Sequence, residues 1–200
     1  DFTTRGRNVS VIFGDGAGAV VLQPTTDENR GILSTHLHSD GADAEILAMY
    51  NPGTHANHWK DNLASFNNAE IADMFMSHEM IDKAELFPNM DGPAVFKTAV
   101  VKFPEVIMEA LATNGYQPAD LTMLIPHQAN LRIAQFVQQK LKLRDDQVYN
   151  NIQKYGNTTA ASVPIALCEA WEQGKIKDGD LVCLAAFGSG FTWASALLKW

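Results

Sequence analysis

Hydrophobic and polar residues follow two different periods along the chain, and these periods predict where strands and helices lie. Apolar runs typical of buried strands cover 9–13, 17–22, 32–37, 121–125, 148–149, 181–187 and 191–199. Apolar residues three and four positions apart predict helices at 68–87 and 93–113, and two more that end near 143 and 172. The order of these segments predicts a mixed α/β fold in which helices cover a sheet.

Glycine and proline residues mark several boundaries between these elements. Gly14-Asp15-Gly16 joins the first two apolar runs, which predicts a β-hairpin. A phosphate-binding loop is the functional alternative, but no helix follows the glycines and no lysine lies among them, so a structural turn is favoured. Pro93 suits a first helical turn, whereas Pro104 within the same helix predicts a kink or a break.

His127 lies in a predicted strand-to-helix turn. The strand 121–125 ends at Pro126, which cannot donate to a sheet, and a helix with one apolar face follows. In open α/β sheets, ligands bind at the carboxyl ends of the strands. A histidine alone in such a turn is more often a structural residue, but a similar strand-turn-helix pattern recurs around Asn157. The two turns together indicate a functional site.

Charge is unevenly distributed over the 200 residues, which carry a formal net charge of −8. The stretch 40–91 contains ten acidic and two basic residues and accounts for the whole excess. A basic stripe typical of nucleic-acid binding is absent from the sequence. No apolar run approaches the roughly 20 residues that span a bilayer. We therefore expect neither a nucleic-acid nor a membrane partner.

The cysteines and histidines suggest neither a disulfide framework nor a metal centre. Cys168 and Cys183 fall in a predicted buried helix and a predicted buried strand, which fits a reducing, cytoplasmic compartment. His36 and His38 share one face of a strand, and His55 and His58 lie in a predicted loop. A metal site at either pair is conceivable, but a polar surface is the favoured interpretation, and we expect no metal.

Four motifs resemble the β-ketoacyl-acyl-carrier-protein synthase III family of the thiolase superfamily, and they occur in the family's order. They are Phe-Gly-Asp-Gly-Ala-Gly-Ala at 13–19, Pro-His-Gln-Ala-Asn at 126–130, Gly-Asn-Thr-Thr-Ala-Ala-Ser-Val-Pro at 156–164 and Ala-Phe-Gly-Ser-Gly-Phe-Thr-Trp at 186–193. The resemblance implies the C-terminal half of a thiolase-like fold. That half is a mixed five-stranded sheet covered by helices, within an α-β-α-β-α sandwich.

The resemblance also implies a reaction, a decarboxylative Claisen condensation that joins an acyl group from an acyl-CoA to malonyl-acyl-carrier protein. His127 and Asn157 match the family residues that stabilise the enolate. A hydrogen-bond donor aimed at charge that develops in the transition state lowers the barrier of the reaction. Ser189 matches the oxyanion-hole position of the glycine-rich loop. No cofactor is expected.

Further site residues carry over from the family by position. Those expected to line the substrate tunnel and the reaction centre are Gly92, Phe96, Asn130 and Phe187. Lys97, Arg132 and Lys140 are expected to form a basic patch for the acidic carrier protein. The expected partners are therefore the carrier protein and coenzyme A thioesters, and the full-length protein is expected to be a homodimer.

The nucleophilic cysteine of the family has no match in this sequence. A reactive cysteine needs a helix N-terminus or a positive neighbour, and neither Cys168 nor Cys183 is in such a context. The sequence is therefore interpreted as a C-terminal half that is inactive without an N-terminal half. The uncharged start of the helix from 158 would then be a face that the other half normally covers, which predicts self-association or a bound N-terminal chain.

The segment 42–90 resembles the family least, and it is interpreted as an acidic, partly helical insertion or lid. Two alternatives remain open. Some relatives transfer the acyl group to an alcohol or an amine and form esters or amides, and the acidic segment is compatible with such an acceptor. In the second alternative, the chain is a non-catalytic partner subunit of a heterodimeric synthase. Such subunits usually lose the residues that His127 and Asn157 match.

Overall fold

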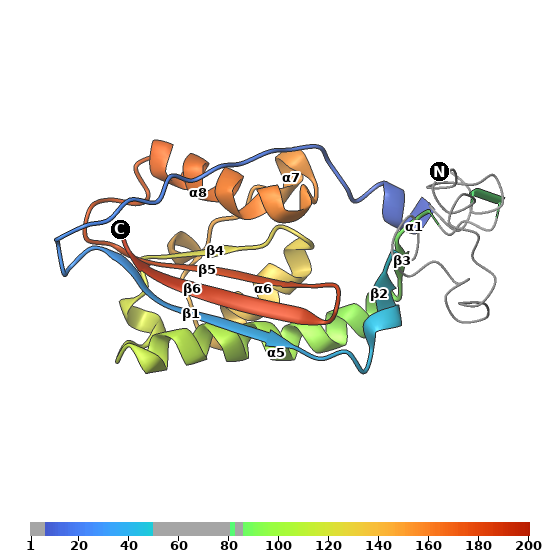
Figure 1. Cartoon of the computed structure of the whole chain (residues 1–200), viewed down its shortest axis with the longest axis horizontal. Helices are drawn as coiled ribbons and strands as arrows, with labels where there is room; N and C mark the ends of the chain where they lie inside the picture. Colours follow the sequence, from blue (N-terminus) through green and yellow to red (C-terminus); the bar gives the residue numbers. More distant parts are fainter. Residues whose placement is uncertain (1–6, 50–80, 83–85) are drawn as a thin grey trace, which may run out of the picture.

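A computed structural model describes residues 7–49, 81–82 and 86–200, and it consists of a sheet between two layers of helices (Figure 1). One layer contains α8 (Ser162–Glu172), and the other contains α5 (Gly92–Thr113) and α6 (Leu131–Leu141). The apolar core fills both interfaces between the sheet and these helices. The predicted mixed α/β class is confirmed.

The main sheet has four strands in the order β1-β6-β5-β4. Their bounds are Gly31–Ser39 for β1, Thr192–Lys199 for β6, Leu181–Gly188 for β5 and Met123–Pro126 for β4. β4 is parallel to β5, whereas the other two pairs are antiparallel, so the sheet is mixed. Sequence reasoning predicted a fifth strand at 148–149. A single bridge between Leu124 and Val148 stands in its place, because the chain leaves β4 after Tyr149 donates one bond to Leu124.

Helix α5 is the longest helix among the described residues and covers the sheet on the side of α6. Its first turn is capped by the Asp91 side chain, which accepts a hydrogen bond from the Ala94 N–H, and Pro93 occupies the first turn as predicted. The helix continues through Pro104, so the predicted break is wrong. Proline removes one backbone hydrogen bond, and the buried residues on both sides of it compensate for that loss: Ala99, Phe103, Val106, Ile107, Ala110 and Leu111.

Short helical turns connect the longer elements. They are η2 (Pro118–Asp120), η3 (Asp145–Gln147), α7 (Ile152–Tyr155) and η4 (Thr159–Ala161). α6 ends at Leu141 rather than near 143, because Lys142 adopts a left-handed conformation with φ of 55°. α8 ends at Glu172, and Gly174, with φ of 68°, follows its C-cap as the sequence predicts.

The N-terminal segment contradicts the predicted hairpin. Residues Arg7–Ser10 form the short helix α1, and the chain from Gly14 to Leu22 is extended without a strand partner of its own. This segment runs along α8, on the side away from the sheet (Figure 1). Its glycines serve close packing rather than a turn, since a Cβ on Gly16 would lie 2.9 Å from Ile165 and one on Gly18 would lie 2.4 Å from Pro164. The start of α8 is thus partly covered within this chain.

The acidic stretch 42–90 is described only at its ends. At one end lie η1 (Ala44–Ile46) and β2 (Leu47–Ala48), and β2 pairs antiparallel with β3 (Asn89–Met90) at the other. This two-stranded pairing was not predicted. Residues 81 and 82 are helical, whereas most of the helix predicted at 68–87, the predicted turn at 51–54 and the pair His55 and His58 lie outside the described residues.

The two cysteines differ in exposure. Cys183 is buried in β5 as predicted, but Cys168 is exposed on α8, so its predicted burial is wrong. The reason is that α8 buries Ala166, Leu167 and Ala170, and position 168 falls on the opposite side of the helix. No helix in the described part of the chain has both the length and the apolar character needed to cross a membrane.

Candidate functional site

A cavity of about 470 Å³ opens between the ends of β4 and β5, the start of α5 and the β2–β3 pair. Seven of the residues that the sequence marked as functional line it: Gly92, Phe96, His127, Asn130, Asn157, Phe187 and Ser189. These residues come from four separate stretches of the chain. The fold therefore gathers in one place the side chains that the motifs marked separately.

His127 is placed by the carboxyl end of β4. Its backbone N–H donates to the carbonyl of Ala185, 2.8 Å away on the parallel strand β5, and its carbonyl accepts from Ala129 at 3.0 Å. Pro126 is the last residue of β4, paired with Ala185. β4 is an edge strand, which tolerates a residue without an N–H, and the chain turns toward α6 after the bond from His127.

The His127 ring is oriented by a serine on the other layer. The Ser162 hydroxyl lies 2.6 Å from Nδ1 of His127, and the same oxygen accepts the backbone N–H of Gln128 at 3.2 Å. Within the described residues, the Ser162 hydroxyl can donate its hydrogen to Nδ1 of His127. We therefore assign the proton of the neutral imidazole to Nε2, which leaves that N–H as a donor.

Burial reinforces this assignment. His127 is half-buried, and desolvation lowers the pKa of its imidazole below the ordinary value. The neutral ring is thus the form present at neutral pH. A neutral ring with a proton on Nε2 is a hydrogen-bond donor that carries no positive charge.

The backbone of Asn157 is held by the N-terminal segment. Its N–H donates to Ile12 at 2.9 Å, and its carbonyl accepts from Gly14 at 3.0 Å, so Phe13 and Asn157 form an isolated parallel bridge. Gly14 is required at this approach, because a Cβ there would lie 1.9 Å from the carbonyl oxygen of Tyr155. The first glycine motif therefore belongs to the site as a support for Asn157.

The side chain of Asn157 is oriented by the backbone two residues later. The Thr159 N–H donates to Oδ1 of Asn157 at 2.8 Å, which identifies that atom as the oxygen and Nδ2 as the donor of the side chain. Thr159 has φ of 52°, an uncommon conformation for a β-branched residue. A strained backbone that points one N–H at one functional oxygen is typical of a preorganised site.

The loop between β5 and β6 forms another wall of the cavity. The Ser189 hydroxyl donates to the carbonyl of Leu47 at 2.6 Å, and the Ser189 carbonyl accepts from Thr192 at 2.8 Å. The first bond ties the loop to β2, and the second lies within the turn between β5 and β6. Ser189 is absent from the described residues with positive φ, so its side chain fits the backbone without strain. Buried Phe187 packs against Phe191, with ring centroids 5.0 Å apart.

The candidate docking residues lie on the outer helices. Lys97 is exposed on α5, and Arg132 and Lys140 are exposed on α6. Asn130 precedes α6 and caps it, since its Oδ1 accepts the Arg132 N–H at 2.9 Å. Its side chain thus has a structural partner in addition to its place in the cavity.

Three supporting residues were not singled out from the sequence: Ser162, Thr159 and Gly14. All three lie inside motifs that were recognised, which was the available signal, but the partners of Ser162 and Gly14 are distant in sequence. The histidines His36 and His38 also have a partner, because both contact the Glu109 carboxylate, at 3.2 and 2.6 Å. Within the described ranges, no three residues among His, Cys, Asp and Glu are grouped in a way that would hold a metal ion.

Comparison with known families and proteins finds matches over most of this chain. The family described as "3-Oxoacyl-[acyl-carrier-protein (ACP)] synthase III C terminal" matches residues 111–200, and "3-Oxoacyl-[acyl-carrier-protein (ACP)] synthase III" matches residues 1–41. Proteins named beta-ketoacyl-[acyl-carrier-protein] synthase III are similar. That of Rhodospirillum centenum is 43% identical, over 97% of this chain and 53% of its own length, and that of Chlorobium phaeobacteroides is 38% identical, over 100% and 55%.

Solved structures agree with the sequence matches. The 3-oxoacyl-[acyl-carrier-protein] synthase III of Aquifex aeolicus superposes with a TM-score of 0.76 at 39% identity, over 97% of this chain and 52% of that one. The synthase III of Pseudomonas aeruginosa gives 0.77 at 36% identity, with the same two coverages. The chain spans about half the length of the curated relatives that it matches.

Proposed function

Because this chain belongs to the 3-oxoacyl-[acyl-carrier-protein] synthase III family, we propose that it carries the enolate-stabilising part of a decarboxylative condensing site. One observation carries the proposal. His127 and Asn157 line the same cavity, and each has its acceptor atom engaged by a neighbour, so that each offers an N–H donor. The site is thus built to bind an oxygen that gains negative charge.

The proposed reaction generates that charge on a malonyl thioester. The bond between the α-carbon and the carboxylate breaks, CO₂ leaves, and the electron pair moves into an enolate whose oxygen was the thioester carbonyl. The enolate carbon then attacks the carbonyl of an acyl-thioester, a carbon–carbon bond forms, and the thiolate leaves.

The two donors act mainly on the first of these steps. Nε2–H of His127 and Nδ2–H of Asn157 are proposed to donate to the thioester oxygen, where charge appears as CO₂ departs. Donors fixed in advance stabilise this transition state more than the ground state. Loss of one such donor typically lowers the rate by about 10²–10³-fold.

The second oxyanion, on the acyl-thioester, needs a different donor. The backbone N–H of Ser189 is proposed for this role, since Ser189 lines the same cavity and its loop is tied to Leu47. We assign the nucleophile to a cysteine outside these 200 residues, because neither cysteine of this chain lines the cavity. Acylation by an acyl-CoA is therefore proposed to require an N-terminal half.

The proposed acceptor is malonyl-acyl-carrier protein. The exposed cations Lys97, Arg132 and Lys140 support this assignment, because the docking partner is acidic. Gly92, Phe96 and Asn130 are proposed to contact the arm that carries the substrate, and Phe187 to screen the reaction centre from water. The whole protein is proposed to be a homodimer.

The direct test is decarboxylation of malonyl-carrier protein by the full protein that contains this sequence. His127→Ala and Asn157→Ala are each expected to slow CO₂ release by about 10²-fold. His36→Ala and Asn29→Ala are matched controls on residues outside the cavity and are expected to retain activity. Product analysis separates a new carbon–carbon bond from an ester or an amide. Undiminished CO₂ release from the His127→Ala and Asn157→Ala variants would contradict the proposal.

A further inference from the structure

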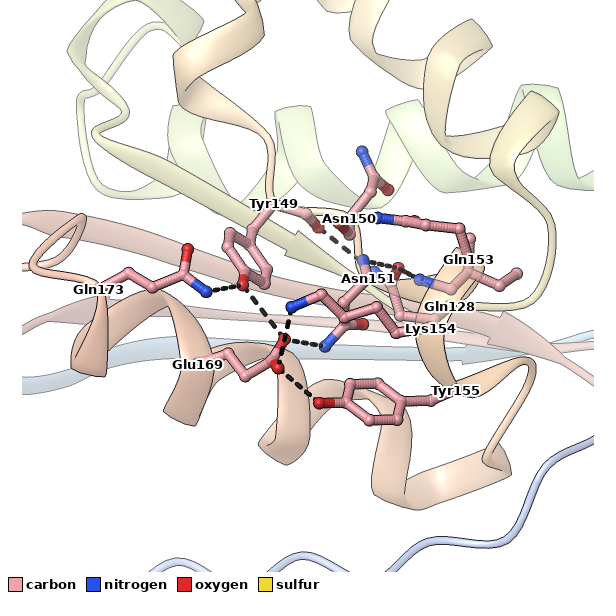
Figure 2. A network of polar contacts seen from close by, with 10 residues as sticks. Gln128, Tyr149, Asn150, Asn151, Gln153, Lys154, Tyr155, Glu169 and Gln173 are labelled. Carbon is pink, nitrogen blue, oxygen red and sulfur yellow. Dashed lines mark hydrogen bonds and ion pairs between the residues drawn. The ribbon is translucent and has the colours of Figure 1, made fainter.

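Glu169 on α8 is the centre of a polar network that the proposed reaction does not use (Figure 2). Its Oε1 accepts from the Tyr155 hydroxyl at 2.6 Å and from Nζ of Lys154 at 3.3 Å. Its Oε2 accepts from Nδ2 of Asn151 at 2.9 Å and from the Tyr149 hydroxyl at 3.1 Å. A carboxylate offers about four acceptor positions, so these donors occupy its full capacity.

All four donors come from one short stretch, residues 149–155. Figure 2 shows their side chains converging on Glu169 from the segment that includes α7. The Tyr149 hydroxyl is itself fixed, because it accepts from Nε2 of Gln173 at 2.7 Å and therefore directs its own hydrogen to Glu169. One carboxylate thus attaches the whole stretch to α8.

Gln128 holds the same stretch from the opposite side. Its Oε1 accepts the backbone N–H groups of Asn151 at 3.0 Å and Ile152 at 3.2 Å, and its Nε2 donates to the Tyr149 carbonyl at 3.3 Å. Gln128 is 3% exposed and directly follows His127 in the chain. The stretch is therefore fixed relative to both α8 and the histidine loop.

The stretch ends two residues before Asn157. α7 stops at Tyr155, and Gly156 turns the chain with φ of 69° while its N–H donates to the Ile152 carbonyl at 2.8 Å. Only Gly156 separates α7 from Asn157, so the position of α7 constrains the chain on the side of Asn157 that the N-terminal segment does not hold. We infer that Glu169 is a positioning residue, which sets the place of Asn157 relative to His127 by anchoring residues 149–155.

The charge state of the network fits a structural anchor rather than an acid or base. Hydrogen bonds from Tyr155 and Asn151, in that order of importance, lower the pKa of the Glu169 carboxyl to about 2. The pKa of the Tyr155 hydroxyl is raised above its ordinary value, chiefly by its bond to Glu169. At neutral pH the acceptor is therefore charged and the tyrosines keep their protons, so the anchor is complete.

The expected loss of activity rests on the proposed function, whereas the expected movement of Asn157 rests on the geometry alone. Two readouts are therefore needed. The first is a comparison of the crystal structures of the Glu169→Gln variant and the wild-type protein. The distance from Nδ2 of Asn157 to Nε2 of His127 is expected to differ between the two, because a glutamine brings its own donor group to four donors. An unchanged distance would overturn the inference whether or not the protein is active.

The second readout is kinetic and uses the full protein that contains this sequence. Glu169→Gln is expected to lower kcat for decarboxylation about 10-fold or more, with the KM for malonyl-carrier protein little changed, since a misplacement of about 1 Å can cost 10²-fold. Transfer of an acyl group from coenzyme A, which does not use Asn157, is expected to keep its rate. An equal loss in both half-reactions would indicate a general structural defect and reject the positioning role.

A double-mutant cycle tests whether Glu169 acts on decarboxylation through Asn157. In the Asn157→Ala background, Glu169→Gln is expected to have no further effect on decarboxylation, because residues that act in series are not additive. Full additivity would overturn the inference. Tyr155→Phe removes one donor to Glu169 and replaces Glu169→Gln as the test variant if the latter does not fold. It is expected to lower the rate of decarboxylation by a smaller factor. Glu169→Asp keeps the charge and is expected to restore part of the rate.

The matched control is Glu172→Gln. Glu172 lies on the same helix, and within the part of the chain that the structure describes its carboxylate forms no hydrogen bond with residues 149–157. The control removes the same charge from α8 and is expected to leave both half-reactions unchanged. A loss as large as that of Glu169→Gln would attribute the effect to net charge and contradict the inference. If the unchanged protein does not decarboxylate malonyl-carrier protein, the proposed function fails, and the crystallographic readout still decides the anchor.

Discussion

The Ser162 hydroxyl lies 2.6 Å from Nδ1 of His127 and joins the start of α8 to the loop that follows β4. The same oxygen accepts the Gln128 N–H, so the serine is held in place while it orients the ring. With the serine hydroxyl assigned as the donor, the imidazole proton lies on Nε2, and His127 presents a donor to the cavity.

Replacement of Ser162 tests this relationship. In Ser162→Ala, Nδ1 of His127 loses its partner and the proton is free to move between the two nitrogens. We expect decarboxylation to fall about 10-fold or more, and nitrogen NMR of the imidazole to report a mixture of tautomers. Ser195→Ala is the control, since Ser195 is equally buried but donates to the Val106 carbonyl. A single Nε2–H tautomer in Ser162→Ala would reject the role of the serine.

Gly14 allows the N-terminal segment to approach Asn157. A Cβ at this position would lie 1.9 Å from the Tyr155 carbonyl oxygen, so Gly14→Ala is expected to push the two segments apart. We expect a loss of about 1–3 kcal/mol in the free energy of unfolding, as for other overpacked sites, together with slower decarboxylation. Gly41→Ala is the matched control, because nothing lies within 4 Å of a Cβ there. Equal melting temperatures for the two variants would contradict the prediction.

The cysteines of this chain are expected to resist acylation. Burial raises the pKa of the Cys183 thiol to about 12, and the pKa of exposed Cys168 is raised by partial desolvation and by the neighbouring Glu172 carboxylate. The thiolate is the reactive form, so both are poor nucleophiles at neutral pH. Intact-mass measurement of the 200-residue chain after incubation with an acyl-CoA should show no stoichiometric adduct. An adduct on either cysteine would overturn the assignment of the nucleophile to another part of the protein.

Acid is expected to weaken the anchor at Glu169. Its folded pKa is depressed to about 2 from an ordinary 4.5, so it contributes stability that is complete above the unfolded pKa and is lost as the pH falls from about 4.5 to 2. The melting temperature of the unchanged protein should therefore approach that of Glu169→Gln across this window. The gap between the two proteins should be constant above about pH 5. A gap that widens as the pH falls would contradict the assigned charge state.

Exposed apolar residues on the N-terminal segment predict self-association. Val21 is 92% exposed and Leu22 is 75% exposed. The start of α8 is partly covered by the same segment, so these residues, and not α8 alone, form the exposed apolar surface. Apolar side chains that lie together on a surface favour association. Light scattering on the 200-residue chain should report a mass above that of a monomer, and Val21→Ser with Leu22→Ser should lower it. A clean monomer that binds no apolar dye would show that this surface does not drive association.

Some features of the site are invisible in the sequence even when the motif is recognised. Asn157 was singled out because it lies in a motif with a known counterpart, but the network around Glu169 spans residues 128 to 173 and has no local pattern. The N-terminal glycines indicated a hairpin because hairpins are their commonest local use. In the fold, the backbone of Gly14 pairs with Asn157 instead, and a local rule cannot anticipate such a distant partner.

The sequence by itself predicted the main strands and helices from α5 to β6, the two turns that bear His127 and Asn157, Pro93 in the first turn of α5 and Gly174 just after α8. These features could be predicted because periodicity, proline and glycine act over a few neighbouring residues. Only the tertiary structure decided the continuation of α5 through Pro104, the exposure of Cys168 and the hydrogen-bond partners in the site. Ser162 and His127 are 35 positions apart, and Ser189 and Leu47 are 142 apart. Such pairs form only when separate elements pack, and packing depends on the whole core rather than on any one segment of the chain.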